Sequence, residues 1–534
     1  MRPKELVERW KDEIDMKRIP SLPFASLPLM PKKALILIGV VTALAAWCFL
    51  SGVGPGFPLD DAWCHQVYAR GIAQGEVFTY NTGEREAGVS SPLWTVLCAV
   101  PIFIAERVLD QSRPDEGIRL LSGLIGFLAI VAGVKLARRA GIWSGASALA
   151  LLTFDPLSLF GCFSGMEQPL FTLLFFILIG ALLDERPRRA GWASGLLMLT
   201  RPEGVVLGLF ALVILRKQRT LLLGTVSRIV LCVAPFLAYN LMVAGHPLPN
   251  TYLMKWSPVF DLSQYWATTQ ALLGDTGYGW ALLVMLGAGI ISLEGGSHRL
   301  GRLPLQASLL LFAAILCTRP MQVATTEIST YVPYYWQRYA LLAWPPILLV
   351  AAAGLASIVR TAWAGLFCRP LSTCVLLIPL ALVIFFGRDA PTHWVALQQR
   401  FAAGCATVES QNVAAGRWLD ENLPSGAQVA THDAGAIRYF SRRRVIDIYG
   451  NNNATLVRAL TTSDPDSNDP GKAARTVLSK ERPDALVILA HPQLGWIDYA
   501  PFFGLTKPAA AFHVDEPGAI PDPTHQDLAI FVRP

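Results

Sequence analysis

Two adjacent aspartates, Asp60 and Asp61, stand a few residues after the first long apolar run of the chain. An ionised carboxylate at a membrane face is costly unless it has partners or water. Paired carboxylates in such a position can deprotonate a hydroxyl group or hold a divalent cation. Capping of a helix over 62–73 would also explain one of the two aspartates, so both interpretations stay open from the residues alone.

Five further charged residues lie where apolar runs end. Arg201, Lys255 and Arg338 are candidates for binding an anion such as phosphate, and the alternative for each is a cation that extends to the membrane interface. Glu167 and Glu203 are carboxylates embedded between apolar runs. They are candidates for binding a polar substrate, and the alternative is pairing with Arg201.

Polar and aromatic residues near these charges extend the candidate site. His65 follows Asp61 by one helical turn, where it would contact an acceptor, help to bind a cation or have only a structural role. Asn250 and Tyr252 are candidates for hydrogen bonds to a sugar or a phosphate. The aromatic residues of 331–336 would stack on sugar rings or form an interfacial belt.

The elements that hold these residues belong to a membrane protein. Of 534 residues, 53% are hydrophobic and 16% are charged, whereas about a quarter of the residues in a soluble domain are charged. This composition excludes a conventional soluble enzyme. Since about 20 apolar residues cross a bilayer, we predict an all-α membrane domain over 34–387. Its eleven spans begin near residues 34, 118, 142, 168, 189, 203, 222, 277, 304, 339 and 371.

The basic residues orient these spans, because Lys and Arg collect on the cytoplasmic side. If the apolar stretch 90–104 spanned the membrane, the three basic clusters near residues 138, 188 and 217 would lie outside. We therefore predict that 90–108 is a juxtamembrane helix at the outer face, within one external loop over 54–117. The segment 1–33 then lies in the cytoplasm, and the domain 388–534 lies outside.

The tail after Arg388 alternates between helical and strand patterns. Helices are predicted at 408–423, 434–440 and 471–481, and strands at 427–430, 445–448 and 485–489. This alternation predicts a small soluble α/β domain after the membrane domain.

Five motifs follow one another along the chain. The first, within 60–94, combines DDAW-x-H-x-x-YAR, G-x-x-F-x-YN-x-GE and AG-x-x-SPLW. The others are SGMEQPLF at 164–171, LTRPEG at 199–204, PNTYLMK at 249–255 and HDAGAIRYFSRRRVIDIYG at 432–450. Together they resemble the bacterial GT-C glycosyltransferases over nearly the whole chain, and look most similar to the branch with the mycobacterial terminal arabinofuranosyltransferases.

This resemblance implies a GT-C enzyme that moves a hexosyl or pentosyl group from a polyprenyl-phosphate sugar to an envelope glycan, lipid or protein acceptor. It favours Asp60 as the base of an inverting, in-line attack, and Asp61 as second choice or as a partner that orients the site or binds a metal. Lys255, Arg201 and Arg338 would bind the donor phosphate. Mg²⁺ or Mn²⁺ at the two aspartates is compatible with the pattern.

Two positions depart from the family pattern: Val67 stands where relatives have an arginine, and His65 replaces a frequent aromatic residue. These departures leave the donor sugar open. In the tail, His432, Asp433 and Asp447 carry the family pattern, and the alternative is that they close turns.

We predict a multi-pass protein of the bacterial inner membrane that contacts lipids and binds no nucleic acid, because the 45 basic residues cluster at the edges of apolar runs. The alternatives are a transporter or lipid-linked sugar flippase, and a non-catalytic carbohydrate-binding protein. The sequence has no paired discontinuous helices in matching halves and no nucleotide-binding loop, which disfavours transport.

Overall fold

The computed structural model describes residues 30–111, 113–217, 219–255, 262–294, 298–318, 337–366, 370–461, 472–489, 498–505, 507–512 and 528–533. Most of the cytoplasmic segment predicted at 1–33 and the aromatic cluster at 331–336 lie outside these residues. Residues Ile38–Pro534 form one compact unit.

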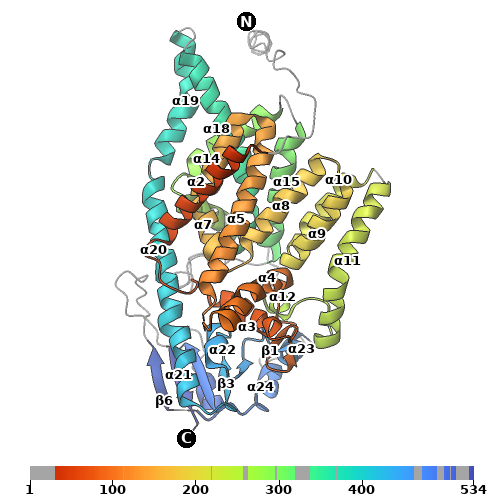
Figure 1. The fold of residues 1–534 in the computed structure, drawn as a ribbon, viewed down its shortest axis with the longest axis vertical. Helices are drawn as coiled ribbons and strands as arrows, with labels where there is room; N and C mark the ends of the chain where they lie inside the picture. Colours follow the sequence, from red (N-terminus) through yellow and green to blue (C-terminus); the bar gives the residue numbers. More distant parts are fainter. Residues whose placement is uncertain are drawn as a thin grey trace. The chain divides into compact units, whose positions relative to one another are not determined.

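Most of the described chain is helical (Figure 1). Before the tail, the helices are α2 (Lys32–Leu50), α3 (Asp60–Ala73), α4 (Pro92–Phe103), α5 (Asp115–Ala137), α6 (Ile142–Phe154), α7 (Pro156–Phe163), α8 (Gln168–Leu183), α9 (Pro187–Thr200), α10 (Gly204–Leu215), α11 (Arg219–Ala244), α12 (Asn250–Lys255), α13 (Leu262–Asp275), α14 (Gly279–Glu294), α15 (His298–Thr318), α17 (Gln337–Ala340), α18 (Trp344–Leu366) and α19 (Pro370–Gly387). A helix begins at or near each of the eleven predicted span starts.

Several of these helices can cross a membrane. Among the described residues, four are long and apolar enough: Lys32–Leu50, Asp115–Ala140, Thr220–Ala244 and Arg338–Trp363. Two bent pairs raise the number to six if each pair is one span. Three further apolar helices are shorter, so the count of eleven stays a prediction.

One of the bent pairs, α6 and α7, has a clear local cause. The two helices meet at 56°, where Pro156 lacks the N–H that would continue α6. The Asp155 carboxylate accepts a hydrogen bond from the Ser158 N–H at 2.7 Å and so caps α7. The periodicity of apolar residues did not reveal this break.

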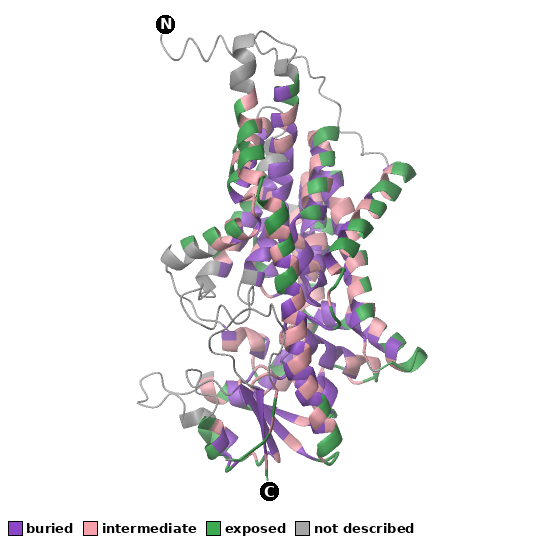
Figure 2. Cartoon of the chain, turned by 90° about the vertical axis from the view of Figure 1, so that its left-hand side faces the viewer, coloured by how far each residue is buried: buried purple, intermediate pink, exposed green. Residues whose placement is uncertain are grey.

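Large apolar side chains are exposed in stripes along the outer helices. Examples four residues apart are Leu120, Leu124 and Leu128 of α5, and Val205, Leu209 and Val213 of α10. Figure 2 shows exposed residues along the helices, whereas the sheet is mostly buried. Exposed apolar stripes mark contact with a membrane or another protein, and helices of this composition fit a membrane.

The predicted external loop, 54–117, is mostly structured. After α3, β1 (Thr79–Asn81) pairs antiparallel with β2 (Glu84–Arg85). Helix α4 packs against α3 and continues into a π-helical turn, Ile104–Val108. In Figure 1, α4 lies across the direction of α5. With 12 residues, α4 is shorter than the about 20 residues that cross a bilayer, and its position at the outer face stays a prediction.

The tail contains the expected small α/β domain. Its sheet has the strand order β4-β3-β5-β7-β6, with β3 parallel to β4 and β5, and β7 antiparallel to β5 and β6. The three predicted strands are confirmed within one residue, whereas β6 and β7 were not predicted. The elements are α20 (Ala390–Val408), α21 (Ala414–Asn422), β3 (Gln428–Thr431), α22 (Ala436–Ser441), β4 (Arg444–Asp447), α23 (Ala454–Thr461), α24 (Lys472–Leu478), β5 (Ala485–Leu489), α25 (Tyr499–Phe502), β6 (Pro508–Phe512) and β7 (Leu528–Val532).

Several contacts join the sheet domain, residues 388–534, to the segment 54–117. Asn81 pairs with the backbone of Val445 through both ends of its amide, donating at 3.1 Å and accepting at 2.9 Å. Arg70 donates to the Tyr439 carbonyl at 2.7 Å, and its guanidinium lies 3.3 Å from the Tyr439 ring centroid. Trp63 packs against the same ring. The sheet domain is therefore positioned by α3 and the hairpin that follows it.

Candidate active site

A small cavity lies where α3, α12 and the sheet domain meet. Its volume is about 40 Å³, enough for one or two water molecules, so a sugar phosphate can bind only if the walls move apart. Six of the ten predicted site residues line it: Asp61, His65, Arg201, Tyr252, Lys255 and Arg338. The rest of the lining is Cys64, Tyr68, Gly88, Val89, Ser90, Met166, Pro202, Thr251, Tyr339, Asn451 and Asn452.

Two cations of this cavity converge on Asp61. Lys255 Nζ lies 3.0 Å from Asp61 Oδ1, and Arg338 Nη2 lies 2.8 Å from Asp61 Oδ2. Both cations are buried. Burial by itself raises the pKa of Asp61, but Arg338 and Lys255 outweigh burial and hold that pKa well below its usual range. Asp61 is therefore ionised, and it keeps two cations together at one point of the cavity wall.

Arg201 lies at the junction of three helix ends. It follows α9, whereas Glu167 and Glu203 precede α8 and α10. Arg201 Nη1 bonds to Glu167, and Nε and Nη2 donate to Glu203 at 3.0 and 3.2 Å. His65 Nε2 lies 3.3 Å from Glu167 Oε2. Glu167 and Glu203 thus both pair with Arg201, which was the alternative to their binding a substrate. This favours a role for Arg201 in holding the two glutamates.

Asp60 has different surroundings from its neighbour. It does not line the cavity; its two carboxylate oxygens accept hydrogen bonds from the Gly435 and Ala436 N–H groups, both at 2.8 Å. These groups begin α22, so Asp60 binds the first turn of a helix in the sheet domain. Burial, followed by the nearby Asp433 carboxylate, raises the pKa of Asp60 to about 8.

We expect Asp60 to make the folded protein less stable as the pH rises. Its pKa in the folded state, about 8, exceeds the ordinary 3.8, so the folded state holds this proton more tightly. The contribution to stability is complete below the ordinary pKa and is lost as the pH rises through the folded pKa. Asp60→Asn cannot titrate and should show a smaller fall in melting temperature between about pH 5 and about pH 9. Equal slopes in both proteins would contradict this assignment.

Asn250 does not line the cavity, but it bonds to residues next to those that do. Its backbone N–H donates to the Ala87 carbonyl at 2.8 Å, and its Nδ2 lies 3.4 Å from Glu86 Oε2. Glu86 also accepts from the Ala454 N–H at 3.1 Å, and burial raises the pKa of Glu86 to about 7. Sequence reasoning missed Glu86, although it lies within the first family motif, between two of its parts.

The two aspartates do not fit a divalent cation in this arrangement. A metal ion would have to displace two backbone N–H groups from Asp60, and Lys255 and Arg338 from Asp61. Within the described ranges, no group of three or more His, Cys, Asp and Glu side chains is placed to hold a metal ion. We therefore derive no step through a metal.

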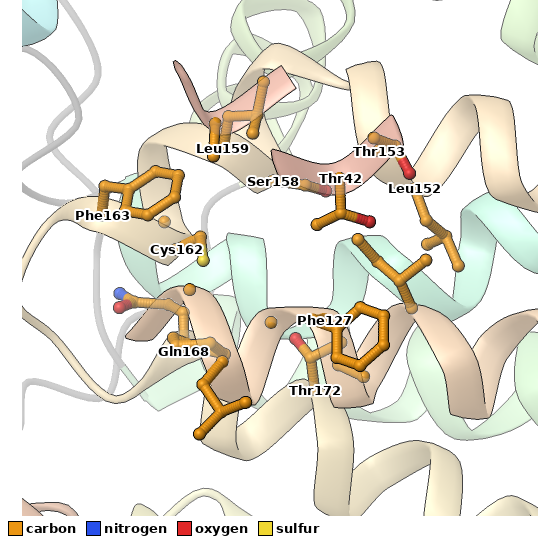
Figure 3. Close-up of a pocket in the computed structure, with 18 of the residues that line it drawn as sticks. Thr42, Phe127, Leu152, Thr153, Ser158, Leu159, Cys162, Phe163, Gln168 and Thr172 are labelled. Carbon is orange, nitrogen blue, oxygen red and sulfur yellow. The ribbon is translucent and has the colours of Figure 1, made fainter. Parts of the chain in front are cut away.

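A second, larger cavity lies among α2, α5, α7, α8 and α18. Its volume is about 690 Å³. Figure 3 shows apolar side chains such as Phe127, Leu152 and Phe163 around it, with a few hydroxyl groups. Two lining residues, Gln168 and Leu341, are close in sequence to Glu167, which bonds to Arg201, and to Tyr339, which lines the first cavity. An apolar cavity of this size suits a hydrocarbon chain.

Comparison with known proteins adds information on the fold. A family model described as "Domain of unknown function (DUF8728)" matches residues 402–527. None of the curated proteins matches the sequence significantly. The crystal structure of ArnT from Cupriavidus metallidurans bound to undecaprenyl phosphate has a TM-score of 0.54 and 12% identity, covering 93% of this chain and 98% of that chain. ArnT in the apo state gives 0.56 and 11%, covering 93% and 97%.

These likenesses extend over both the membrane helices and the tail. They lend no support to the arabinofuranosyltransferase-like branch in particular. The chain has the fold of ArnT over nearly its whole length, which confirms the GT-C fold that the sequence motifs implied.

Proposed function

We propose that this protein is an integral membrane glycosyltransferase that takes a sugar from a polyprenyl-phosphate donor. The observation that carries the proposal is the convergence of Lys255 and Arg338 on Asp61 in a buried cavity. Two cations are the groups that a donor phosphate needs, and a carboxylate is the group that an acceptor hydroxyl needs. The fold shared with ArnT, which was crystallised with undecaprenyl phosphate, supports this donor class.

Binding of the donor would prepare the base. The phosphate would take Lys255 and Arg338 as its partners, so the pKa of Asp61 would rise and its carboxylate would become free to accept a proton. The acceptor hydroxyl oxygen would then bond to the anomeric carbon from the side opposite the phosphate. The bond from that carbon to the phosphate oxygen would break, polyprenyl phosphate would leave, and Asp61 would hold the hydroxyl proton. The configuration would be inverted.

The contacts favour Asp61 over Asp60 as this base. Asp60 was the first choice from the sequence resemblance, and that assignment stays a prediction. Both oxygens of Asp60 are engaged by α22, whereas Asp61 lines the cavity. In this proposal Asp60 is a positioning residue that seats the sheet domain.

The direct test uses purified protein in lipid nanodiscs with a panel of polyprenyl-phosphate sugars and extracted envelope acceptors. We expect release of polyprenyl phosphate together with glycosylation of an acceptor, and accumulation of the polyprenyl-phosphate sugar in a deletion strain. Movement of an intact lipid-linked sugar across the membrane, without its consumption, would instead indicate a flippase. Binding of glycans without transfer would indicate a carbohydrate-binding protein.

We further propose that the larger apolar cavity holds the polyprenyl chain. Gly123 of α5 lines this cavity, and a Cβ at that position would lie 3.5 Å from the Phe163 ring, an ordinary contact. Gly123→Leu should therefore fold and fill part of the cavity. We expect it to raise the KM for long-chain donors about tenfold, with little effect on donors of one or two isoprene units.

A matched control is Gly180→Leu, because a Cβ there also has its first neighbour at 3.5 Å but Gly180 does not line the cavity. A KM that changes equally for short and long donors in Gly123→Leu would show that the chain binds elsewhere.

The remaining assignments complete the proposal. The protein would be a multi-pass protein of the bacterial inner membrane, with its N-terminus in the cytoplasm and domain 388–534 in the periplasm. The acceptor would be an envelope glycan, lipid or protein. Cysteine labelling from either side of the membrane at an exposed residue of α21 would test the position of the tail.

A further inference from the structure

The sheet domain supplies one wall of the small cavity. Asn451 and Asn452, which line the cavity, lie in the turn after β4. Both belong to the region matched by the family model of unknown function. The tail therefore reaches the same cavity as Asp61, Lys255 and Arg338.

Asp447 makes this turn rigid. Its carboxylate accepts hydrogen bonds from the N–H groups of Tyr449, Gly450 and Asn452, at 2.9, 3.0 and 2.8 Å, and from Asn452 Nδ2 at 2.9 Å. The alternative that Asp447 closes a turn is thus confirmed. Since four donors bind one buried carboxylate, the backbone of the turn has little freedom.

Residues of the segment 54–117 also hold this turn. The Tyr68 hydroxyl donates to Asn452 Oδ1 at 2.8 Å. Gly88 lies so close that a Cβ there would overlap the Tyr68 hydroxyl and Asn452 Oδ1. Only glycine at position 88 leaves room for the turn after β4 to lie this close to the loop before α4. Asn452 is therefore a structural contact, and it holds its neighbour Asn451 at the cavity.

Asn451 and Thr251, which both line the cavity, each have an oxygen atom available to a ligand. Within the part of the chain that the structure describes, Asn451 Oδ1 and Thr251 Oγ1 are buried and have no hydrogen-bond partner. Thr251 lies on α12, four residues before Lys255. An unpaired buried polar atom destabilises the site, and a bound hydroxyl group would give it a partner.

We propose that Asn451 and Thr251 form hydrogen bonds with hydroxyl groups of the donor sugar. Through Asn451, the domain of unknown function is then a specificity element of the donor site. This inference rests on the proposed function. Asn451 would accept a hydrogen bond from one sugar hydroxyl, and Thr251 would bond to another, while Lys255 and Arg338 hold the phosphate. A site built to bond a hydroxyl rejects an analogue that lacks it, because its own polar atom then stays unpaired.

The test compares the donor that supports transfer with its singly deoxygenated analogues. We expect wild-type protein to disfavour at least two analogues by about tenfold or more in kcat/KM. Asn451→Ala should lose the discrimination at one sugar position, and Thr251→Val at a different position. Discrimination at all other positions should stay unchanged, which a general disturbance of the fold would not produce.

The matched control is Asn422→Ala, which changes an exposed asparagine of α21 in the same domain and should keep the wild-type pattern. If Asn451→Ala fails to fold, Asn451→Ser provides the same comparison with a smaller change. An unaltered pattern of discrimination in both variants of Asn451, in a protein that transfers sugar, overturns this inference alone. Absence of transfer by wild-type protein with every donor overturns the proposed function.

Discussion

Asp61→Asn is expected to bind the polyprenyl-phosphate donor more tightly than wild-type protein and to transfer its sugar about a thousandfold more slowly. In the unliganded site the Asp61 carboxylate competes with the phosphate for Lys255 and Arg338. The neutral amide removes that competition, so the donor gains affinity. The amide is also unable to accept the acceptor's proton, so the chemical step is lost. Donor titration and single-turnover transfer measure the two effects separately.

The opposite signs of these effects make the result specific. Loss of folding would weaken binding and transfer together, and so would loss of a residue that only positions the site. Asp60→Asn serves as the internal comparison, because it should lower both quantities through poorer seating of α22. Asp184→Asn is a control, since Asp184 forms a 2.8 Å ion pair with Arg139 away from the cavity. Full transfer by Asp61→Asn together with none by Asp60→Asn would return the role of the base to Asp60.

Lys255→Gln and Arg338→Gln are expected to lower kcat/KM for the donor about a hundredfold each. Each removes a buried positive charge that faces the position proposed for the phosphate. The charge of the phosphate grows as the glycosidic bond breaks, so the loss should affect kcat as well as KM. We expect the two losses to be less than additive, because either variant leaves the same Asp61 carboxylate with one cation.

Arg139→Gln is the matched control for these variants. It also removes one arginine from an ion pair, but Arg139 follows the C-terminal end of α5 and does not line the small cavity. It should therefore leave donor kinetics unchanged.

Arg201→Gln should differ from the variants of Lys255 and Arg338 and from this control. Because Arg201 bonds to Glu167 and Glu203, its loss removes the cation that both buried carboxylates share and should lower thermal stability strongly. Normal stability with a selective loss of donor affinity would instead make Arg201 a phosphate ligand.

Local sequence patterns predicted the elements well. The apolar runs located a helix at each expected span, and the alternating patterns located β3, β4 and β5 within one residue. These features depend on nearby residues. Strands β6 and β7 were missed, because β7 pairs with β5, more than 35 residues earlier, and such pairing leaves little local signal. The bend at Asp155 was missed because a single proline changes a helix that composition describes as continuous.

In the candidate site, too, the sequence predicted the residue types but not the contacts between distant residues. The sequence identified the charged residues, and six of ten predicted residues line one cavity. It did not distinguish Asp60 from Asp61. Successive residues of a helix point about 100° apart, so at the start of α3 one carboxylate meets the sheet domain and the other meets Lys255 and Arg338. The partner that each aspartate meets is therefore decided by α12, α17 and α22, which are far from α3 in the sequence.

By itself, the sequence determined that this is a membrane protein, which helices it forms, and which scarce charges are available for chemistry. Those properties follow from composition and from periodicity over a few residues. The tertiary structure alone decided which aspartate faces the cavity, that Arg201 holds two glutamates, and that the tail returns to complete the site. The hydrogen bond between Tyr68 and Asn452 joins residues 384 positions apart, and a contact of that kind exists only once the whole chain has folded.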